Sequence, residues 1–198
     1  SGCDINIFLN FTKYVPNSQI KKLKYTYRNS QELIDISTKF VMKNKCQIKK
    51  KLLSHKHLDK PIEFIYYINP YIVFKKLYNK LKKENTDLLI LGRNNFDINK
   101  FSKEEIKEFM SVHSSKGLEA ENVILINLTD GLYGFPNKII NSKLIEELHS
   151  SDKTYLYAEE RRLFYVALTR TKNKVYILVP FFNKSIFIKE LKKIMRFK

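Results

Sequence analysis

The stretch Val112-His113-Ser114-Ser115-Lys116-Gly117-Leu118-Glu119 joins two short apolar runs, Phe109–Val112 and Val123–Ile126. Short, continuously apolar runs are typical of parallel strands that are buried on both faces of a sheet. Between the two runs, hydroxyl residues followed by Lys116-Gly117 place backbone N–H groups and a cation where an anion can bind. Because Ser, Lys and Gly are also common in turns, an anion-binding loop and a plain turn both fit this stretch taken alone.

Strand and helix patterns alternate on either side of this stretch, which predicts an α/β domain with a mainly parallel sheet. Further strands are expected at Ile20–Tyr27, Ile62–Tyr67, Asp87–Leu91 and Lys174–Val179. Helices are expected at Ile5–Tyr14, after Asn29, at Pro70–Lys83, Lys143–His149, Ala158–Thr169 and Lys184–Met195. Asn29 is predicted to cap its helix with Glu32 as reciprocal partner, and Asn183 to cap the last one. Leu33, Ile36, Phe40 and Val41 fall on one helical face.

The chain of 198 residues is strongly basic, with Lys+Arg 37 against Asp+Glu 20 and a net charge of +17. Such a charge suits a polyanion, nucleic acid above all. The wealth of Lys, Asn and Ile is equally typical of an AT-rich genome. Runs such as Lys49-Lys50-Lys51 and Lys192-Lys193 are therefore expected to be exposed faces rather than binding sites.

Several other protein classes do not fit. No apolar run approaches the ~20 residues of a membrane span. The start, Ser1-Gly2-Cys3-Asp4, is no signal peptide and lacks Met, so we expect a piece of a longer protein. Cys3 and Cys46 are too few for a disulfide framework, which predicts a cytoplasmic protein. His55 and His57 have no third ligand nearby, so we expect a solvated loop and no metal.

Two further stretches offer chemistry. Glu159 to Arg170, EERRLFYVALTR, has helical periodicity with Leu163, Val166 and Ala167 on the buried side, and its carboxylates suit a helix N-terminus. On periodicity alone, a surface helix with i,i+4 ion pairs is the favoured interpretation. The stretch 25–30 (YTYRNS) places an aromatic ring beside a guanidinium, which can stack on a base and bind phosphate. A core tyrosine and a solvated arginine are the alternative.

Taken together, these stretches resemble the C-terminal motor domain (2A) of UvrD/Rep-type superfamily 1 DNA helicases. Residues 26–30 (TYRNS) resemble motif IV, 112–119 (VHSSKGLE) motif V, and 159–170 (EERRLFYVALTR) motif VI. Residues 89–94 (LILGRN) resemble the strand after motif IV, and 131–136 (GLYGFP) the Gly-x-Phe-Pro segment after motif V. The resemblance covers about Asp4–Leu178. It implies a RecA-like (P-loop NTPase-type) three-layer sandwich, with residues 1–198 forming a single domain.

In the helicases that the chain resembles, ATP lies between two RecA-like domains, and the first domain carries the P-loop and the Mg²⁺-binding acids. No GxxxxGK[ST] pattern occurs here. The resemblance therefore implies the second domain, with the missing first domain and single-stranded DNA as partners. It also implies that the chain alone is inactive and that the Mg²⁺ ligands lie in the missing domain.

The resemblance assigns site residues by motif position. Arg28 and Arg170 would act as arginine fingers on the γ-phosphate, which can contribute ~10³–10⁵ in rate. Tyr27 would stack on adenine, Glu119 would accept a hydrogen bond from the ribose, and Gly117 would let the backbone approach the phosphates. Single-stranded DNA would meet residues Ser111, His113 and the region around Phe135.

The chain departs from the family at two points. Ser111 stands where many relatives have Thr. The large inserted domain (2B) that usually separates the Arg93 strand from motif V is absent or reduced to one short helix, because only Asn95–Glu108 lie there. A translocase that strips proteins from DNA, moving 3′ to 5′, is therefore expected rather than a strong unwinder. A non-catalytic nucleic-acid-binding module and an RNA polymerase-associated remodeller with the same core remain alternatives.

Overall fold

The computed structural model describes residues 10–19, 21, 23–44, 47, 51–139 and 157–196. Its centre is a sheet of five parallel strands in the order β1-β5-β4-β2-β3. The strands are β1 (Ile62–Tyr67), β2 (Leu88–Gly92), β3 (Phe109–Ser111), β4 (Ala120–Leu125) and β5 (Thr171–Pro180). The helices are α2 (Phe11–Tyr14), α3 (Gln31–Val41), α4 (Pro70–Lys83), the 3₁₀ helix η1 (Asp97–Lys100), α6 (Ala158–Leu168) and α7 (Ile186–Arg196).

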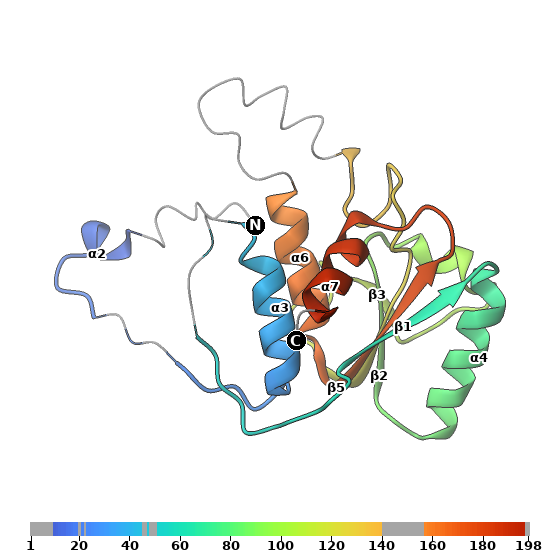
Figure 1. Cartoon of the computed structure of the whole chain (residues 1–198), viewed down its shortest axis with the longest axis horizontal. Helices are drawn as coiled ribbons and strands as arrows, with labels where there is room; N and C mark the ends of the chain where they lie inside the picture. The colour runs from blue at the N-terminus through green and yellow to red at the C-terminus, as the bar shows by residue number, and fades with distance from the viewer. Residues whose placement is uncertain are drawn as a thin grey trace.

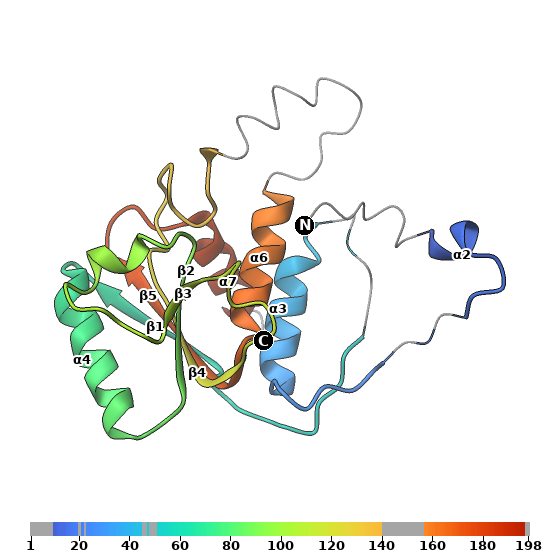
Figure 2. The same cartoon turned by 180° about the vertical axis from the view of Figure 1, so that it is seen from behind.

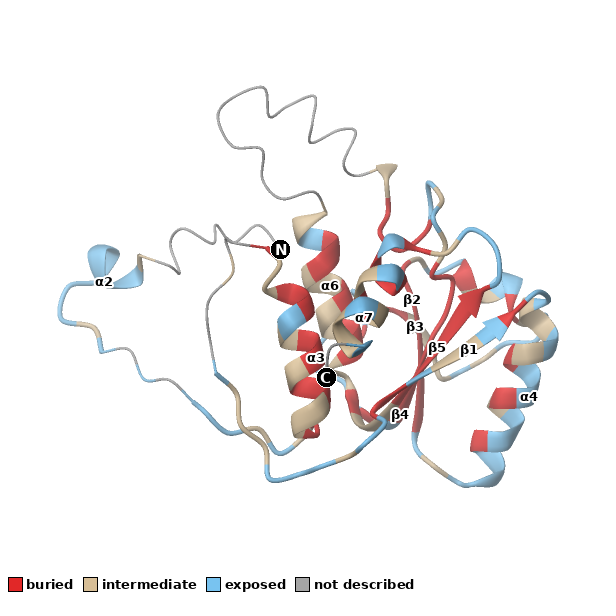
Figure 3. Ribbon diagram, in the orientation of Figure 1, coloured by how far each residue is buried: buried red, intermediate tan, exposed pale blue. Residues whose placement is uncertain are grey.

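Helices cover both faces of the sheet, which gives three layers (Figures 1 and 2). Successive strand residues point to opposite faces. Leu89 and Leu91 of β2 join the core beneath α3, α6 and α7, whereas Leu88 and Ile90 join the core beneath α4. Both faces of the central strands are therefore buried (Figure 3), as their continuously apolar sequences predict.

Most of the expected elements are confirmed. The strand Ile62–Tyr67 and the helix Pro70–Lys83 have the predicted limits, and the strands around residues 88, 110, 123 and 175 are present. Residues 127–138, which the structure describes, are irregular apart from an isolated bridge at Thr129. The expected helix Lys143–His149 lies outside the described residues, as do residues 5–9 of the expected first helix. No described helix has both the length and the apolar character needed to cross a bilayer.

The expected strand Ile20–Tyr27 is wrong. Its described residues make one bridge, Tyr25 to Leu53, and lie outside the sheet. Leu23 and Tyr25 are exposed, because no helix or strand covers this apolar run.

Both predicted helix caps are also displaced. Ser30, not Asn29, caps α3 through a hydrogen bond from the Leu33 N–H. At α7 the Ser185 hydroxyl accepts from the Phe187 N–H, while Asn183 has a left-handed backbone. In each case the hydroxyl residue immediately before the helix takes the role that the asparagine was expected to have.

Helix α6 buries more of its surface than its periodicity indicates. Phe164, Ala167 and Leu168 are buried, whereas Leu163 and Val166 are only partly covered. Arg161 is buried as well: its guanidinium lies 4.5 Å from the Phe40 ring centre and donates to Glu190 of α7 at 2.7 Å. The alternative of a surface helix with ion pairs within itself is therefore wrong, since Glu160 and Arg161 of α6 are buried and bind residues of other elements.

We expect Phe164→Ala to lower the free energy of unfolding by about 3–5 kcal/mol. The ring is fully buried and contacts Phe40, Phe135 and Phe187, with centroids 5.2–5.4 Å apart. Phe182→Ala is the matched control, because Phe182 is exposed, and it should change stability by less than about 0.5 kcal/mol. Urea denaturation of both variants tests this; equal losses would contradict the packing described here.

Candidate functional site

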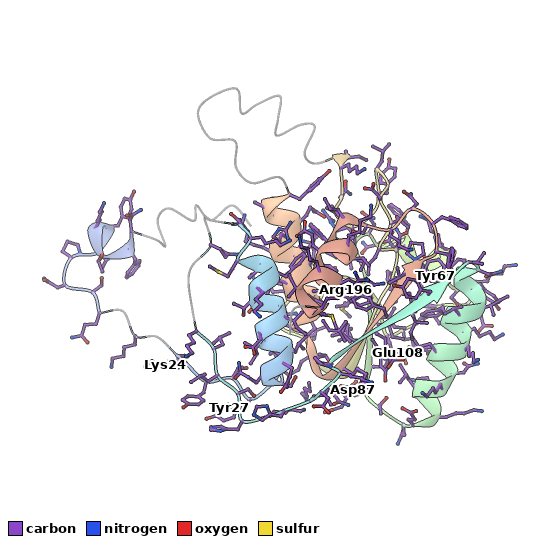
Figure 4. All side chains as sticks on the ribbon, in the orientation of Figure 1. Lys24, Tyr27, Tyr67, Asp87, Glu108 and Arg196 are labelled. Atoms are coloured by element: carbon purple, nitrogen blue, oxygen red, sulfur yellow. The ribbon has the colours of Figure 1, made fainter. Side chains whose placement is uncertain are left out.

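Three stretches that are far apart in the sequence meet at the N-terminal ends of the strands. We call this side of the sheet, where the strands begin, the cationic edge. Ala120 of β4 pairs with Thr171 of β5, so the residues that precede these strands, Glu119 and Arg170, are neighbours. The side-chain amide of Asn29 donates to the carbonyls of Thr169 and Thr171, at 3.2 and 2.7 Å. The segment that contains Tyr27 and Arg28 is thereby fixed to the same edge, where Figure 4 labels Tyr27.

Positive charge dominates this edge. Arg28 Nε donates to Glu119 Oε2 at 2.6 Å, and Lys172 Nζ lies 3.2 Å from Glu119 Oε1. Arg170 Nη1 donates to the Leu118 carbonyl at 3.1 Å. Three cations therefore surround one carboxylate, and the excess of positive charge favours an anionic ligand.

Arg28 and Arg170 are close enough to repel each other electrostatically. Burial lowers the pKa of Arg170, the charge of Arg28 lowers it further, and Glu119 opposes both. Hydrogen bonds from Arg28 and Lys172 lower the pKa of Glu119, so this carboxylate stays ionised. The Nε of Arg170 is buried and has no hydrogen-bond partner among the described residues. An unpaired buried donor is costly, and because this nitrogen has almost no accessible surface, an incoming anion would have to bind the other nitrogens of the guanidinium.

The neighbouring surface is open. Tyr27 is 85% exposed, so its ring is available for stacking. Gly117 has φ +90°, a conformation that favours glycine, and no atom lies within 4 Å of the position that a Cβ would occupy. Both residues are thus placed beside the cationic edge. Lys172 was not among the expected residues; it alternates with Arg170 around Thr171, and strand periodicity indicates that the two share a side.

The residues expected to meet DNA lie at the opposite edge, because the loop 112–119 runs from the end of β3 to the start of β4. His113 is exposed there, and partial burial and the charge of Arg93 lower its pKa. Ser111 is buried and its hydroxyl pairs with the Ser114 hydroxyl at 2.9 Å. The Phe135 side chain is 2% exposed and packs against Phe164, so the expectation that it contacts DNA is corrected: it belongs to the core. The exposed aromatic residue of that segment is Tyr133.

A buried ion pair organises this second edge. Arg93, at the end of β2, binds Glu160 of α6 through Nε and Nη2 at 2.8–3.0 Å, and Glu160 also accepts from the Asn137 N–H at 2.8 Å. Nearby, Asp97 accepts from Asn94 and Asn127. The segment Asn95–Glu108 contains one short 3₁₀ helix, as expected in place of the inserted domain. No three His, Cys, Asp or Glu side chains gather as metal ligands anywhere in the described ranges.

We expect Glu160→Gln to destabilise the protein by about 3–5 kcal/mol, because it leaves the buried Arg93 charge without a counter-charge. Glu159→Gln is the matched control, since Glu159 is the exposed neighbour on the same helix. Thermal and urea denaturation of the two variants compare them. A Glu160→Gln variant as stable as Glu159→Gln would contradict a structural role for the pair.

Known proteins resemble this chain along most of its length. Residues 71–180 match the family of the UvrD-like helicase C-terminal domain. DNA helicase IV of Escherichia coli (strain K12) is 29% identical over 201 residues, which cover 98% of this chain and 29% of that protein. The ATP-dependent DNA helicase Rep of Buchnera aphidicola subsp. Schizaphis graminum (strain Sg) is 38% identical over 80 residues, which cover 40% of this chain and 10% of that protein.

The fold is similar to a solved structure, the C-terminal domain of a possible DNA helicase from Lactobacillus plantarum WCFS1. The two chains superimpose with a TM-score of 0.52 at 15% identity, over 84% of this chain and 94% of the other. The expected RecA-like α/β fold is thereby confirmed. This chain spans less than a third of helicase IV and a tenth of Rep. Because the family match covers more than half of the 198-residue chain, the chain belongs to the UvrD-like helicase C-terminal domain family.

Proposed function

We propose that this chain is the second motor domain of an ATP-dependent DNA helicase or translocase, and that it supplies one side of the ATP site. The observation that carries the proposal is the meeting of Arg28 and Arg170 around Glu119 at one edge of the sheet. A domain with this edge and no P-loop of its own needs a second domain to hold the nucleotide. The nucleotide would lie between that domain and the cationic edge.

At this edge the guanidinium groups would neutralise the charge that spreads over the phosphoryl oxygens in the transition state. Glu119 holds Arg28 in place. Its two carboxylate oxygens already bind Arg28 and Lys172, so it could accept a hydrogen bond from a ribose hydroxyl only at an oxygen that one of these cations also contacts. Tyr27 would stack on adenine, and Gly117 would allow the backbone to approach the phosphates. The Mg²⁺ that accompanies ATP would be held by acids of the first motor domain and would supply further charge neutralisation.

Single-stranded DNA would meet the opposite edge, with movement 3′ to 5′ as the family resemblance implies. His113 is exposed there, and Tyr133 offers an exposed ring that packs edge-on against Phe96. Stacking on such rings tolerates any base. Ser111 would act through its hydrogen bond to Ser114 rather than by direct contact, since its own side chain is buried.

A non-catalytic nucleic-acid-binding module would share the charge of the chain. A pair of arginines that converges beside one carboxylate favours the motor, because binding DNA at the other edge gives this pair no use.

Arg170→Ala, in the polypeptide that contains both motor domains, is expected to lower DNA-stimulated ATP turnover by about 10³–10⁵ and to preserve most ATP binding. The loss arises because the guanidinium acts mainly on the transition state. Arg162→Ala is the control, since Arg162 lies near the start of α6, the helix whose other end leads to Arg170 at the cationic edge. Turnover should be measured with a phosphate-release assay, and affinity with a fluorescent ATP analogue. Wild-type turnover in Arg170→Ala would remove the arginine-finger assignment.

The short segment Asn95–Glu108 predicts weak unwinding by the complete polypeptide, because little protein is present there to contact the duplex. Strand displacement on a tailed duplex should be slow relative to ATP hydrolysis, while displacement of a protein bound to single-stranded DNA should keep pace with it. Fast strand displacement would end the view that the protein is mainly a translocase.

A further inference from the structure

The last helix carries a row of cations that the proposed function does not use. Lys189, Lys192, Lys193 and Arg196 are spaced i, i+3, i+4 and i+7 along α7, so they share one side of the helix. They line a hollow of about 420 Å³. We call these four residues the α7 stripe; Figure 4 labels Arg196 near its end. The helix buries Phe187, Ile188 and Leu191 elsewhere on its surface.

Among the residues that the structure describes, no carboxylate pairs with these cations. Within the described ranges, none of the four cations takes part in an ion pair. Glu190, the acid within α7, is held away by Lys43 and the buried Arg161, at 2.8 and 2.7 Å. Burial lowers the pKa of Lys192, and the charge of Arg196 lowers it further. The α7 stripe is therefore a patch of uncompensated positive charge.

The surface beside the stripe limits what it can bind. Lys192 lies over the rings of Tyr66 and Phe64 of β1, 4.3 and 5.1 Å from their centres, and Lys184 lies over Tyr66 at 5.5 Å. Although Tyr66 is 40% exposed, lysine ammonium groups already lie over these rings, so a base could stack on them only by displacing the lysines. Binding single strands without sequence preference relies on such stacking. A ligand recognised by charge alone fits better.

We propose that the α7 stripe binds the phosphate backbone of duplex DNA, at a site separate from both edges of the sheet. A helix rises about 1.5 Å per residue, so the stripe spans roughly 10 Å. Duplex DNA carries one charge per about 1.7 Å of its axis, so several phosphates lie within this length. Lysine point charges and the arginine fork both suit phosphate oxygens. The inference goes beyond the proposed function, and takes from it only that the polyanion is DNA.

The test compares two triple variants of the 198-residue chain. Lys189→Gln, Lys193→Gln and Arg196→Gln together remove three charges from the stripe, while Lys192 is kept because it packs on β1. Lys76→Gln, Lys80→Gln and Lys83→Gln together remove three charges from α4, at the same i, i+4, i+7 spacing on exposed positions of the opposite layer. Circular dichroism verifies that both variants are folded.

Binding to a blunt, labelled duplex of about 20 base pairs is measured by fluorescence anisotropy over a range of salt concentrations. The stripe variant should bind at least about tenfold more weakly at low salt, and the slope of log K against log salt should fall by about 2–3, or about 0.9 per lost phosphate contact. The α4 variant should keep the wild-type slope and lie within about twofold in affinity. The same measurement on a single strand of equal length should show a smaller difference between the two variants.

Equal losses in the two variants would overturn the proposal, since they would show a response to net charge alone. The proposal would also be overturned if the stripe variant bound the duplex as well as the wild type, or if its loss of affinity were larger for the single strand. It would be overturned too if a polyglutamate peptide displaced the labelled duplex from the wild-type chain as effectively as unlabelled duplex does. These results do not depend on ATP turnover. Failure of the stripe would leave Arg170→Ala to be judged separately, and the stripe residues lie outside the proposed ATP site.

Discussion

One side-chain amide holds the proposed ATP edge together. Asn29 donates two hydrogen bonds to carbonyls on either side of Arg170, in a buried position, and so ties the segment of Arg28 to the end of α6. Without these bonds Arg28 would belong to a surface segment held by the Tyr25–Leu53 bridge and by its own pair with Glu119. Two guanidinium groups repel each other, so bringing them together needs fixed backbone on both sides as well as the carboxylate of Glu119.

The two edges of the sheet differ in how their charges are used. At the edge where the strands begin, two cations share the carboxylate of Glu119, a third cation lies beside them, and one guanidinium nitrogen has no partner among the described residues. At the other edge, Arg93 and Glu160 satisfy each other and are buried. The first arrangement is poised for an anionic ligand, whereas the second fixes structure. Under the proposed function, arginine would be a binding residue at the first edge, whereas at the second it is an internal support.

Local signals predicted much of this fold. The limits of β1 follow from a short, mostly apolar run, and those of α4 from a proline at the helix start and from helical periodicity. These signals depend on nearby residues alone. The meeting of Arg28, Glu119 and Arg170 was expected from motif order, and the structure brings them together. The strand expected at Ile20–Tyr27 failed because an apolar run becomes a strand only when a neighbouring strand and a covering layer are available. Asn29 was assigned as a cap, but it binds carbonyls that no local pattern reveals. The burial of Phe135 and the ion pair of Glu160 were missed for the same reason: their partners, Phe164 and Arg93, are distant in the sequence.

Helix α6 joins the two edges in a direct mechanical way. Its first turn holds Glu160, which is clamped by Arg93 and the Asn137 backbone, and its last turn leads into Arg170. An intact α-helix of 11 residues is a stiff rod, roughly 16 Å long. A displacement of the segment that contains Asn137 would thus tilt α6 as a rigid body, and the Arg170 guanidinium beyond its other end would move with the helix.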